Sequence, residues 1–224
     1  IITYAASFGA TNVDILDRLG ERNRVAALLK KLDKISVRDD KSAETVKILM
    51  GIEPERHLDP VFIFDYDNLM PQEVRQKGYM IVYTYPGRIT DPLEIKAIQD
   101  YARKRHLKLI SIGHYFSWCD DVVVPHPFEV LALFKHATCI VTDTFHGSVF
   151  SIKYNKQFCT IVRKMNSNKL TSLLEQFHLS CRMINNTNEL PEIMDTPIDY
   201  SFVNKKLAEE KIRSINYLKD NLII

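Results

Sequence analysis

The sequence predicts an α/β protein built from Rossmann-like, doubly wound parallel sheets. Short apolar runs typical of buried strands alternate with amphipathic stretches typical of helices, above all between residues 78 and 200. Segments of these lengths fit strand–helix–strand units, whose strands pair in parallel through right-handed crossovers. The chain has 224 residues, which corresponds to about one and a half domains at roughly 150 residues each.

Residues 1–77 contain few such units. The expected elements are, in order, a strand at 1–6, a helix with an apolar face at 25–32, a strand at 34–37 and a helix at 42–50 that ends at Gly51. Two or three units are too few to cover both faces of a sheet. We therefore expect residues 1–77 to be the carboxyl-terminal part of a first, incomplete Rossmann-like domain together with a linker. The absence of an initial methionine agrees with this expectation.

Residues 78–200 are expected to form a second, whole Rossmann-like domain. The expected elements are, in order, strand 80–85, helix 92–105, strands 107–112 and 122–124, helix 127–137, strand 138–142, helix 145–154, strand 158–162 and helix 169–177. Asp91 and Pro92 are typical of a helix start, and Glu94 stands where a capping box places its carboxylate. A last helix in residues 201–224 is expected to pack back on the first domain.

Ligands of such sheets bind at the carboxyl ends of the strands. This rule selects loops that follow expected strands, at 85–91, 113–120, 125–128, 143–147 and 163–168. Ser7 and Gly9 follow the first expected strand, and Tyr85 and Gly87 follow the strand at 80–85. These four residues are predicted to bind substrate.

The loop at 143–147 is the most informative, because Asp143 ends a strand and His146 stands at the start of a helix. Amides at a helix amino end bind anions, and an imidazole can donate a proton near neutral pH. The alternative is that Asp143 caps the helix and His146 is an ordinary turn residue.

Arg38 lies at the carboxyl end of the strand at 34–37. Its planar guanidinium suits a two-pronged contact with a carboxylate or a phosphate. The alternative is a salt bridge to Asp39, Asp40 or Glu44.

Three further groups lie in the selected loops. His114 and His126 follow strands on the ligand side. The aromatic run Tyr115 to Trp118 either stacks against a sugar or folds under and packs. The cations Arg163, Lys164 and Lys169 either meet a phosphate or form solvated surface.

Composition excludes several classes of protein. Thirty Lys and Arg against 28 Asp and Glu give a net charge of +2, which does not favour a nucleic-acid partner and allows at most peripheral membrane contact. No run approaches the roughly 20 apolar residues that span a bilayer. Four widely spaced cysteines without a CxxC pair fit reduced side chains in a cytoplasmic protein, and no metal site is predicted. P-loop, HExxH, GxSxG and complete GxGxxG motifs are absent.

Several segments in consistent order, from about residue 4 to residue 190, match one known family. They read Val37-Arg38-Asp39, Leu58-Asp59-Pro60-Val61-Phe62, Pro127-Phe128-Glu129, Asp143-Thr144-Phe145-His146-Gly147-Ser148-Val149-Phe150-Ser151-Ile152 and Asn168-Lys169-Leu170. Together they resemble the polysaccharide pyruvyl transferase family, and the first and fourth segments are the most specific.

The resemblance implies a GT-B-like fold and transfer of a pyruvyl group from phosphoenolpyruvate to a sugar, forming a ketal in cell-surface polysaccharide. Phosphoenolpyruvate is a co-substrate, so no cofactor is expected. The implied acceptor is a sugar or a lipid-linked oligosaccharide. His146 is implied as the acid/base group, Arg38 as a clamp for the anionic donor and Asp143 as the residue that orients the histidine. The amides of residues 146–148 are expected to hold phosphate.

The predicted substrate-binding set is Thr144, Phe145, Gly147, Ser148, Ser7, Gly9, Tyr85, Gly87, His114, Trp118 and Lys169. Pyruvylating members often carry an arginine where this chain has Thr144, and the family's amino-terminal motif with glycine and asparagine is missing. A GT-B glycosyltransferase with a nucleotide-sugar donor and a non-catalytic sugar-binding module therefore remain as alternatives.

Overall fold

The computed structural model describes residues 1–163 and 167–222, which fall into two compact units. The first unit comprises Ile1–Phe64, Met165–Leu173 and Asn204–Ile224, and the second comprises Asp65–Lys164 and Leu174–Val203. The first segment of the first unit ends at Phe64, and both units are discontinuous in sequence.

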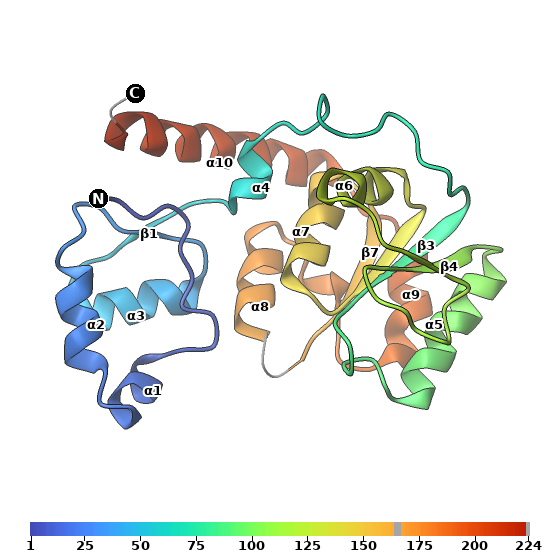
Figure 1. Cartoon of the computed structure of the whole chain (residues 1–224), viewed down its shortest axis with the longest axis horizontal. Coiled ribbons are helices and arrows are strands. Elements are labelled where there is room, and N and C mark those ends of the chain that lie inside the picture. The colour runs from blue at the N-terminus through green and yellow to red at the C-terminus, as the bar shows by residue number, and fades with distance from the viewer. Residues whose placement is uncertain (164–166, 223–224) are drawn as a thin grey trace. The chain divides into compact units, whose positions relative to one another are not determined.

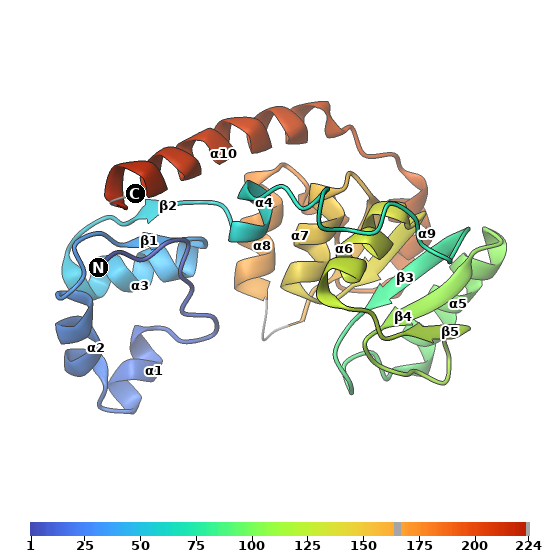
Figure 2. The same cartoon turned by 45° about the horizontal axis from the view of Figure 1, so that its top comes forward.

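The second unit is built on a six-stranded parallel sheet (Figure 1). Its strands are β3 (Tyr79–Tyr83), β4 (Lys108–Ile112), β5 (Asp121–Val123), β6 (Cys139–Thr142), β7 (Gln157–Ile161) and β8 (Met183–Ile184). They are arranged in the order β5-β4-β3-β6-β7-β8, and every neighbouring pair is parallel. Figure 2 shows β3, β4 and β5 side by side. This order reverses between β3 and β6, as in a doubly wound Rossmann sheet, so the predicted fold class is confirmed.

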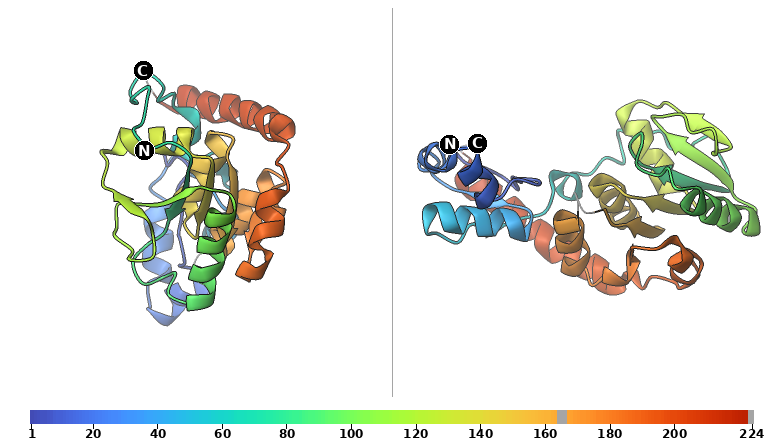
Figure 3. Two further views of the ribbon diagram at one scale, coloured as in Figure 1. Left: turned by 90° about the vertical axis from the view of Figure 1, so that its right-hand side faces the viewer. Right: turned by 90° about the horizontal axis from the view of Figure 1, so that it is seen from below.

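Helices cover both faces of this sheet (Figure 3). They are α5 (Pro92–Lys104), α6 (Pro127–His136), α7 (Phe145–Lys153) and α9 (Leu190–Asp195), while α8 (Ser167–Gln176) and α10 (Tyr200–Asn221) each continue from one unit into the other. Short 3-10 turns lie at Ser180–Arg182 and Thr187–Glu189. A sheet with helices on both faces needs strands that are apolar on both sides.

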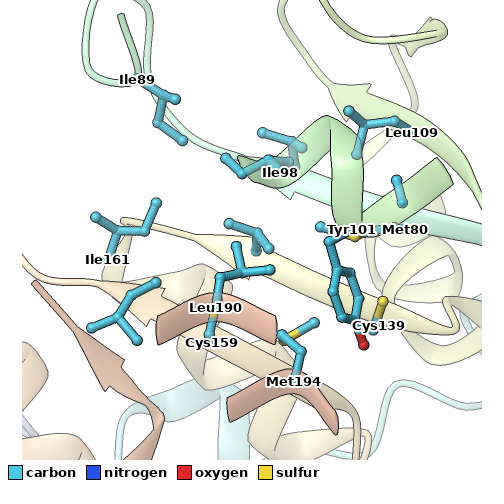
Figure 4. Packing of buried hydrophobic residues seen from close by; sticks show 14 residues of the cluster. Met80, Ile89, Ile98, Tyr101, Leu109, Cys139, Cys159, Ile161, Leu190 and Met194 are labelled. Carbon is cyan, nitrogen blue, oxygen red and sulfur yellow. The ribbon is translucent and has the colours of Figure 1, made fainter. Parts of the chain in front are cut away.

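Alternate residues of β3 supply those two apolar sides. Met80 and Val82 join the cluster under α5 and α9, together with Tyr101 and Leu190 (Figure 4). On the other side, the Tyr83 ring meets Phe134 of α6 edge-on at 5.3 Å and lies 6.3 Å from Phe150 of α7. The carboxyl ends of the strands are thereby held on a rigid base.

Two details of the second unit differ from the sequence-based expectations. The Asp91 side chain caps α5 by accepting from the Leu93 amide at 2.9 Å, but Glu94 does not complete a capping box, because its carboxylate binds Arg163. Strand β8 and helix α9 were not expected, since two and six residues are too few to show a clear period.

The first unit contains short elements around a small apolar cluster. They are α1 (Val13–Arg18), α2 (Arg22–Leu29), β1 (Ser36–Val37), α3 (Asp40–Met50), β2 (Glu55–Arg56) and α4 (Pro60–Ile63). Strands β1 and β2 pair in parallel. Val37 and Val46 are fully buried in the cluster, and α3 ends at Gly51, whose φ of 69° is left-handed, as expected.

The predicted strand at 1–6 is wrong. Only two isolated parallel bridges form there, between Ile2 and Lys34 and between Ala6 and Val37. Ala5 has a φ of 48°, and its amide donates to the Ser36 hydroxyl instead of a strand partner. This left-handed residue interrupts the extended backbone.

The carboxyl-terminal part of α10 packs within the first unit. The Tyr217 hydroxyl donates to the Thr3 carbonyl at 2.8 Å, and the Ser214 hydroxyl accepts from the Leu58 amide at 3.2 Å. The Tyr217 ring also lies 4.4 Å from the ring of the buried His57. Within residues 1–163 and 167–222, no helix has both the length and the apolar character required to cross a membrane.

Candidate functional site

The candidate site begins where the strand order reverses, because two polar side chains meet at the ends of β3 and β6. Thr84 follows β3, and its hydroxyl donates to Asp143 Oδ1 at 2.7 Å. Asp143 follows β6 and is 0% exposed. This is the switch point at which doubly wound sheets bind ligands.

Two arginines approach the Asp143 carboxylate from different loops. Arg88 Nη1 lies 3.8 Å from Oδ1 and donates to the Asp143 carbonyl at 3.4 Å. Arg163 Nε, just after β7, lies 3.8 Å from Oδ2. The Arg163 fork also makes a two-pronged contact with Glu94 at 2.9 and 2.7 Å. The Arg88 guanidinium lies 4.5 Å from the centre of the exposed Tyr85 ring.

Burial and the neighbouring groups have opposite effects on the pKa of Asp143. Burial raises the pKa of the Asp143 carboxyl above its ordinary value, although the Thr84 hydrogen bond and the charges of Arg88 and Arg163 oppose that rise. The side chains of Arg88 and Arg163 keep 24% and 26% of their surface exposed. The buried carboxylate therefore fixes two guanidinium groups that solvent, or an anionic ligand, can reach.

His146 lies in the first turn of α7 and is exposed. Its ring is stacked 5.9 Å from Phe150 and meets the buried Phe145 edge-on at 5.5 Å. Two aromatic neighbours limit the orientations of the imidazole, while its exposure allows it to reach a ligand.

The cap of α7 is not the one given by the alternative interpretation of this loop, in which Asp143 caps the helix. Thr144, not Asp143, is the N-cap: its hydroxyl accepts from the Gly147 amide at 2.9 Å. The Ser148 amide donates to the Thr144 carbonyl at 3.3 Å. The amides of residues 147 and 148 thus already have acceptors, which contradicts their predicted role in phosphate binding. The Ser148 side chain is also buried, and its hydroxyl is 2.9 Å from that of Thr160.

Gly147 is required by close packing. A Cβ atom at this position would lie 2.1 Å from Thr142 Oγ1 and 2.8 Å from Thr144 Oγ1, both inside any normal contact. Only glycine lets α7 begin this close to the end of β6.

Arg38 belongs to the first unit and pairs with a residue that the sequence did not suggest. Its Nη1 binds Asp59 Oδ2 at 2.5 Å, and the Asp59 side chain is only 4% exposed. Asp39 instead caps α3 and accepts from the Ser7 hydroxyl at 2.7 Å. The Gly9 amide donates to that hydroxyl at 3.1 Å, so Ser7 and Gly9 gather at the end of β1.

The predicted site residues fall into two groups. Ser7, Gly9, Arg38 and Lys169 lie in the first unit, and the second unit contains Tyr85, Gly87, His114, Trp118, Asp143, Thr144, Phe145, His146, Gly147 and Ser148. Gly87, His114 and Trp118 line one cavity of about 400 Å³. Lys169 is half-buried in α8, and Lys164 lies outside the described residues.

The sequence reasoning missed Arg88 and the role of Glu94. Arg88 lies inside the selected loop 85–91, so its charge beside Gly87 was the available signal. Glu94 stood in a position that a helix cap explains equally well. Among the described residues, no group of three or more His, Cys, Asp or Glu side chains could hold a metal ion.

Comparison with known proteins identifies one family. A family model described as polysaccharide pyruvyl transferase matches residues 1–164. No curated protein sequence matches the chain.

Several solved structures share the fold at low sequence identity. S. aureus MnaA with UDP is 14% identical with a TM-score of 0.56, over 98% of this chain and 67% of that chain. The glycotransferase of kitacinnamycin is 10% identical with a TM-score of 0.54, over 93% and 65%. Arabidopsis thaliana UGT89C1 with UDP-L-rhamnose is 8% identical with a TM-score of 0.52, over 94% and 59%. The chain thus spans about two thirds of the length of these structures, and the likeness supports the GT-B-like, Rossmann-type fold.

Proposed function

The chain belongs to the polysaccharide pyruvyl transferase family, and from this premise we propose that it takes part in transfer of a pyruvyl group from phosphoenolpyruvate to two hydroxyl groups of a sugar. The product is a ketal in a cell-surface polysaccharide, and the proposed location is the cytoplasm. The observation that carries the proposal is the pair Arg88 and Arg163, held by Asp143 at the strand-order reversal.

The reaction requires a proton and a site for a strongly anionic donor. A proton is added to the methylene carbon of phosphoenolpyruvate, which makes the neighbouring carbon oxocarbenium-like and open to attack by a sugar hydroxyl. A second hydroxyl displaces phosphate from that carbon. One of the two hydroxyl protons replaces the proton that the acid gave to the methylene carbon, and the other leaves with phosphate.

Arg88 and Arg163 are proposed to bind the carboxylate and phosphate of the donor. The Arg88 fork suits either group, whereas Arg163, whose Nη1 and Nη2 already bind Glu94, contributes positive charge, and partial burial strengthens both contributions. Glu94 and Asp143 hold the forks in place before the ligand arrives. Many family members carry an arginine at the position of Thr144 in this chain. Arg88 and Arg163 are proposed to supply the positive charge that Thr144 lacks.

His146 is proposed to be the proton donor, with an effect on rate of about 10²–10⁴. Its exposed ring at the start of α7 lies in the turn that follows Asp143. The role of Arg38 as a second donor clamp remains a prediction, and Asp59 holds its guanidinium in a fixed direction.

Calorimetric titration with phosphoenolpyruvate tests the donor. We expect saturable binding that Arg88→Gln weakens about tenfold or more, since one charge-assisted contact contributes about 1.5–3 kcal/mol. His146→Ala should preserve donor binding and thermal stability but abolish transfer. Loss of folding in His146→Ala would instead support a structural role for the histidine.

A second candidate is transfer of a sugar from a nucleotide-sugar. The observation that favours it is that the solved structures of similar fold include S. aureus MnaA with UDP and Arabidopsis thaliana UGT89C1 with UDP-L-rhamnose. The same calorimeter separates the two candidates. Binding of UDP-glucose without binding of phosphoenolpyruvate would reject pyruvyl transfer.

A further inference from the structure

The cavity that Gly87, His114 and Trp118 line in the second unit lies next to the arginine cluster along the chain and has a different chemical character. It is shallow and widely open to solvent, has a volume of about 400 Å³, and lies between the loop that follows β3 and the loop that follows β4. Gly87 lines it, and the next residue along the chain is Arg88 of the candidate donor site. The cavity therefore opens at the same edge of the sheet as Asp143.

Aromatic side chains form one wall of this cavity. The Phe116 and Trp118 rings lie 5.6 Å apart with an angle of 31° between their planes, and His114 meets Phe116 edge-on at 5.0 Å. Trp118 is half-buried against the main apolar cluster, whereas Tyr115 is 66% exposed. The loop thus packs through Trp118, as one of its two interpretations expects, and presents Tyr115 to solvent, while stacking against a sugar stays a prediction.

Hydrogen bonds fix the loop before any ligand binds. The Gln99 amide of α5 donates to the Trp118 carbonyl at 2.8 Å, and the Cys119 amide donates to the Phe116 carbonyl at 3.0 Å. Gly113, which begins the loop, has a φ of 79°, and its amide donates to the Val123 carbonyl at 2.8 Å. A wall fixed in this way loses little conformational entropy on binding.

The lining of the cavity selects a neutral ligand. Among the described residues that line it, none is Asp, Glu, Lys or Arg, so it offers no fixed charge to phosphoenolpyruvate. Aromatic rings pack well against the C–H faces of a sugar ring. The Thr90 and Ser117 hydroxyls and the His114 imidazole can exchange hydrogen bonds with its hydroxyl groups.

We propose that this aromatic cavity is the acceptor subsite and binds one neutral hexopyranose ring of the polysaccharide, with Tyr115 covering the ring. The proposal rests on the proposed function, because that function defines a sugar acceptor. In this proposal the donor and the acceptor bind at different places along the same sheet edge. The arginines bind the anionic donor, and the uncharged aromatic wall binds the acceptor sugar.

The only tryptophan of the chain is Trp118, which lines this cavity, so tryptophan fluorescence can follow ligand binding there. The probes are methyl β-D-galactopyranoside, methyl β-D-glucopyranoside, uridine and phosphoenolpyruvate, each titrated through the millimolar range. We expect at least one of the two glycosides to change Trp118 emission saturably, with or without saturating phosphoenolpyruvate. Tyr115→Ala should weaken that binding about tenfold.

Phe128→Ala is the matched control, because Phe128 is an exposed aromatic residue of the same unit outside the cavity. It should leave glycoside affinity unchanged. The proposal is overturned if neither glycoside gives a saturable change, if uridine alone does so, or if Tyr115→Ala binds as tightly as the parent. Failure of phosphoenolpyruvate to bind in the calorimeter, with glycoside binding intact, would reject the donor and not the saccharide cavity.

Discussion

Gly147→Ala is the substitution whose effect follows most directly from the structure. The new Cβ would lie 2.1 Å from Thr142 Oγ1, 2.7 Å from Thr142 Cβ and 2.8 Å from Thr144 Oγ1. Thr142 cannot easily withdraw, because its hydroxyl donates to the Tyr83 carbonyl at 2.6 Å and accepts from the Thr144 amide at 3.0 Å. Severe overpacking costs about 3 kcal/mol or more, while alanine in a helix recovers about 1 kcal/mol relative to glycine.

The expected net loss is therefore about 2 kcal/mol, which lowers Tm by about 4–8 °C in a chain of this size. Thermal unfolding followed by circular dichroism measures it. The control is a double-mutant cycle with Thr142→Gly, in which removing both Thr142 contacts should reduce the cost of Gly147→Ala by about 1 kcal/mol or more. An unchanged or higher Tm in the single variant would refute the packing argument.

Three further predictions concern charge and reactivity. His57 is buried, and burial lowers its pKa below the ordinary value, so the fold disfavours its charged form. The stability that neutral His57 allows is fully present above the ordinary pKa of about 6.5 and falls as the pH drops below it. Tm measured against pH should show this fall, and His57→Gln should flatten it. Cys181 is exposed and should react with a thiol reagent in the native protein. Cys139 and Cys159 are buried, and burial raises the pKa of Cys139 to about 12, so both should react only after unfolding. Equal reaction rates for the three cysteines would contradict the structure. Arg88→Lys should weaken phosphoenolpyruvate binding nearly as much as Arg88→Gln, because an ammonium lacks the planar fork, and full rescue by lysine would show that charge alone matters.

Most of the second unit could be predicted from the sequence. Its central strands, such as β3, are buried on both faces and read as continuous apolar runs, and its helices begin at recognisable caps such as Asp91-Pro92. The rule that ligands bind at strand carboxyl ends then selected the loops that contain Asp143, His146 and Gly87, and Asp143 does lie at the strand-order reversal.

The remaining features depend on contacts between distant segments, which a local pattern does not encode. The sequence offered Asp143 as a possible cap for α7, but Thr144 caps that helix, and the Asp143 carboxylate accepts instead from Thr84, 59 residues away. Glu94 looked like a cap residue until the fold brought Arg163 to it. Arg38 had three acidic neighbours in sequence, yet it pairs with Asp59, 21 residues away.

Some of the shortest elements also escaped prediction. Strand β8 and helix α9 are too short for a periodic pattern, and the break at Ala5 depends on a hydrogen bond to Ser36 rather than on its own residue type. Tertiary hydrogen bonds thus decided the features that local propensity left open.

The central claim is that phosphoenolpyruvate donates its three-carbon unit after protonation of its methylene carbon. The most direct test is turnover in D₂O with phosphoenolpyruvate and a methyl hexopyranoside bound at Trp118, followed by mass spectrometry and phosphate assay. The account predicts a pyruvyl ketal whose methyl group carries one deuterium, formed with an equal amount of free phosphate and lost in His146→Ala. Phosphoenolpyruvate left intact while UDP-glucose glycosylates the same acceptor would contradict it.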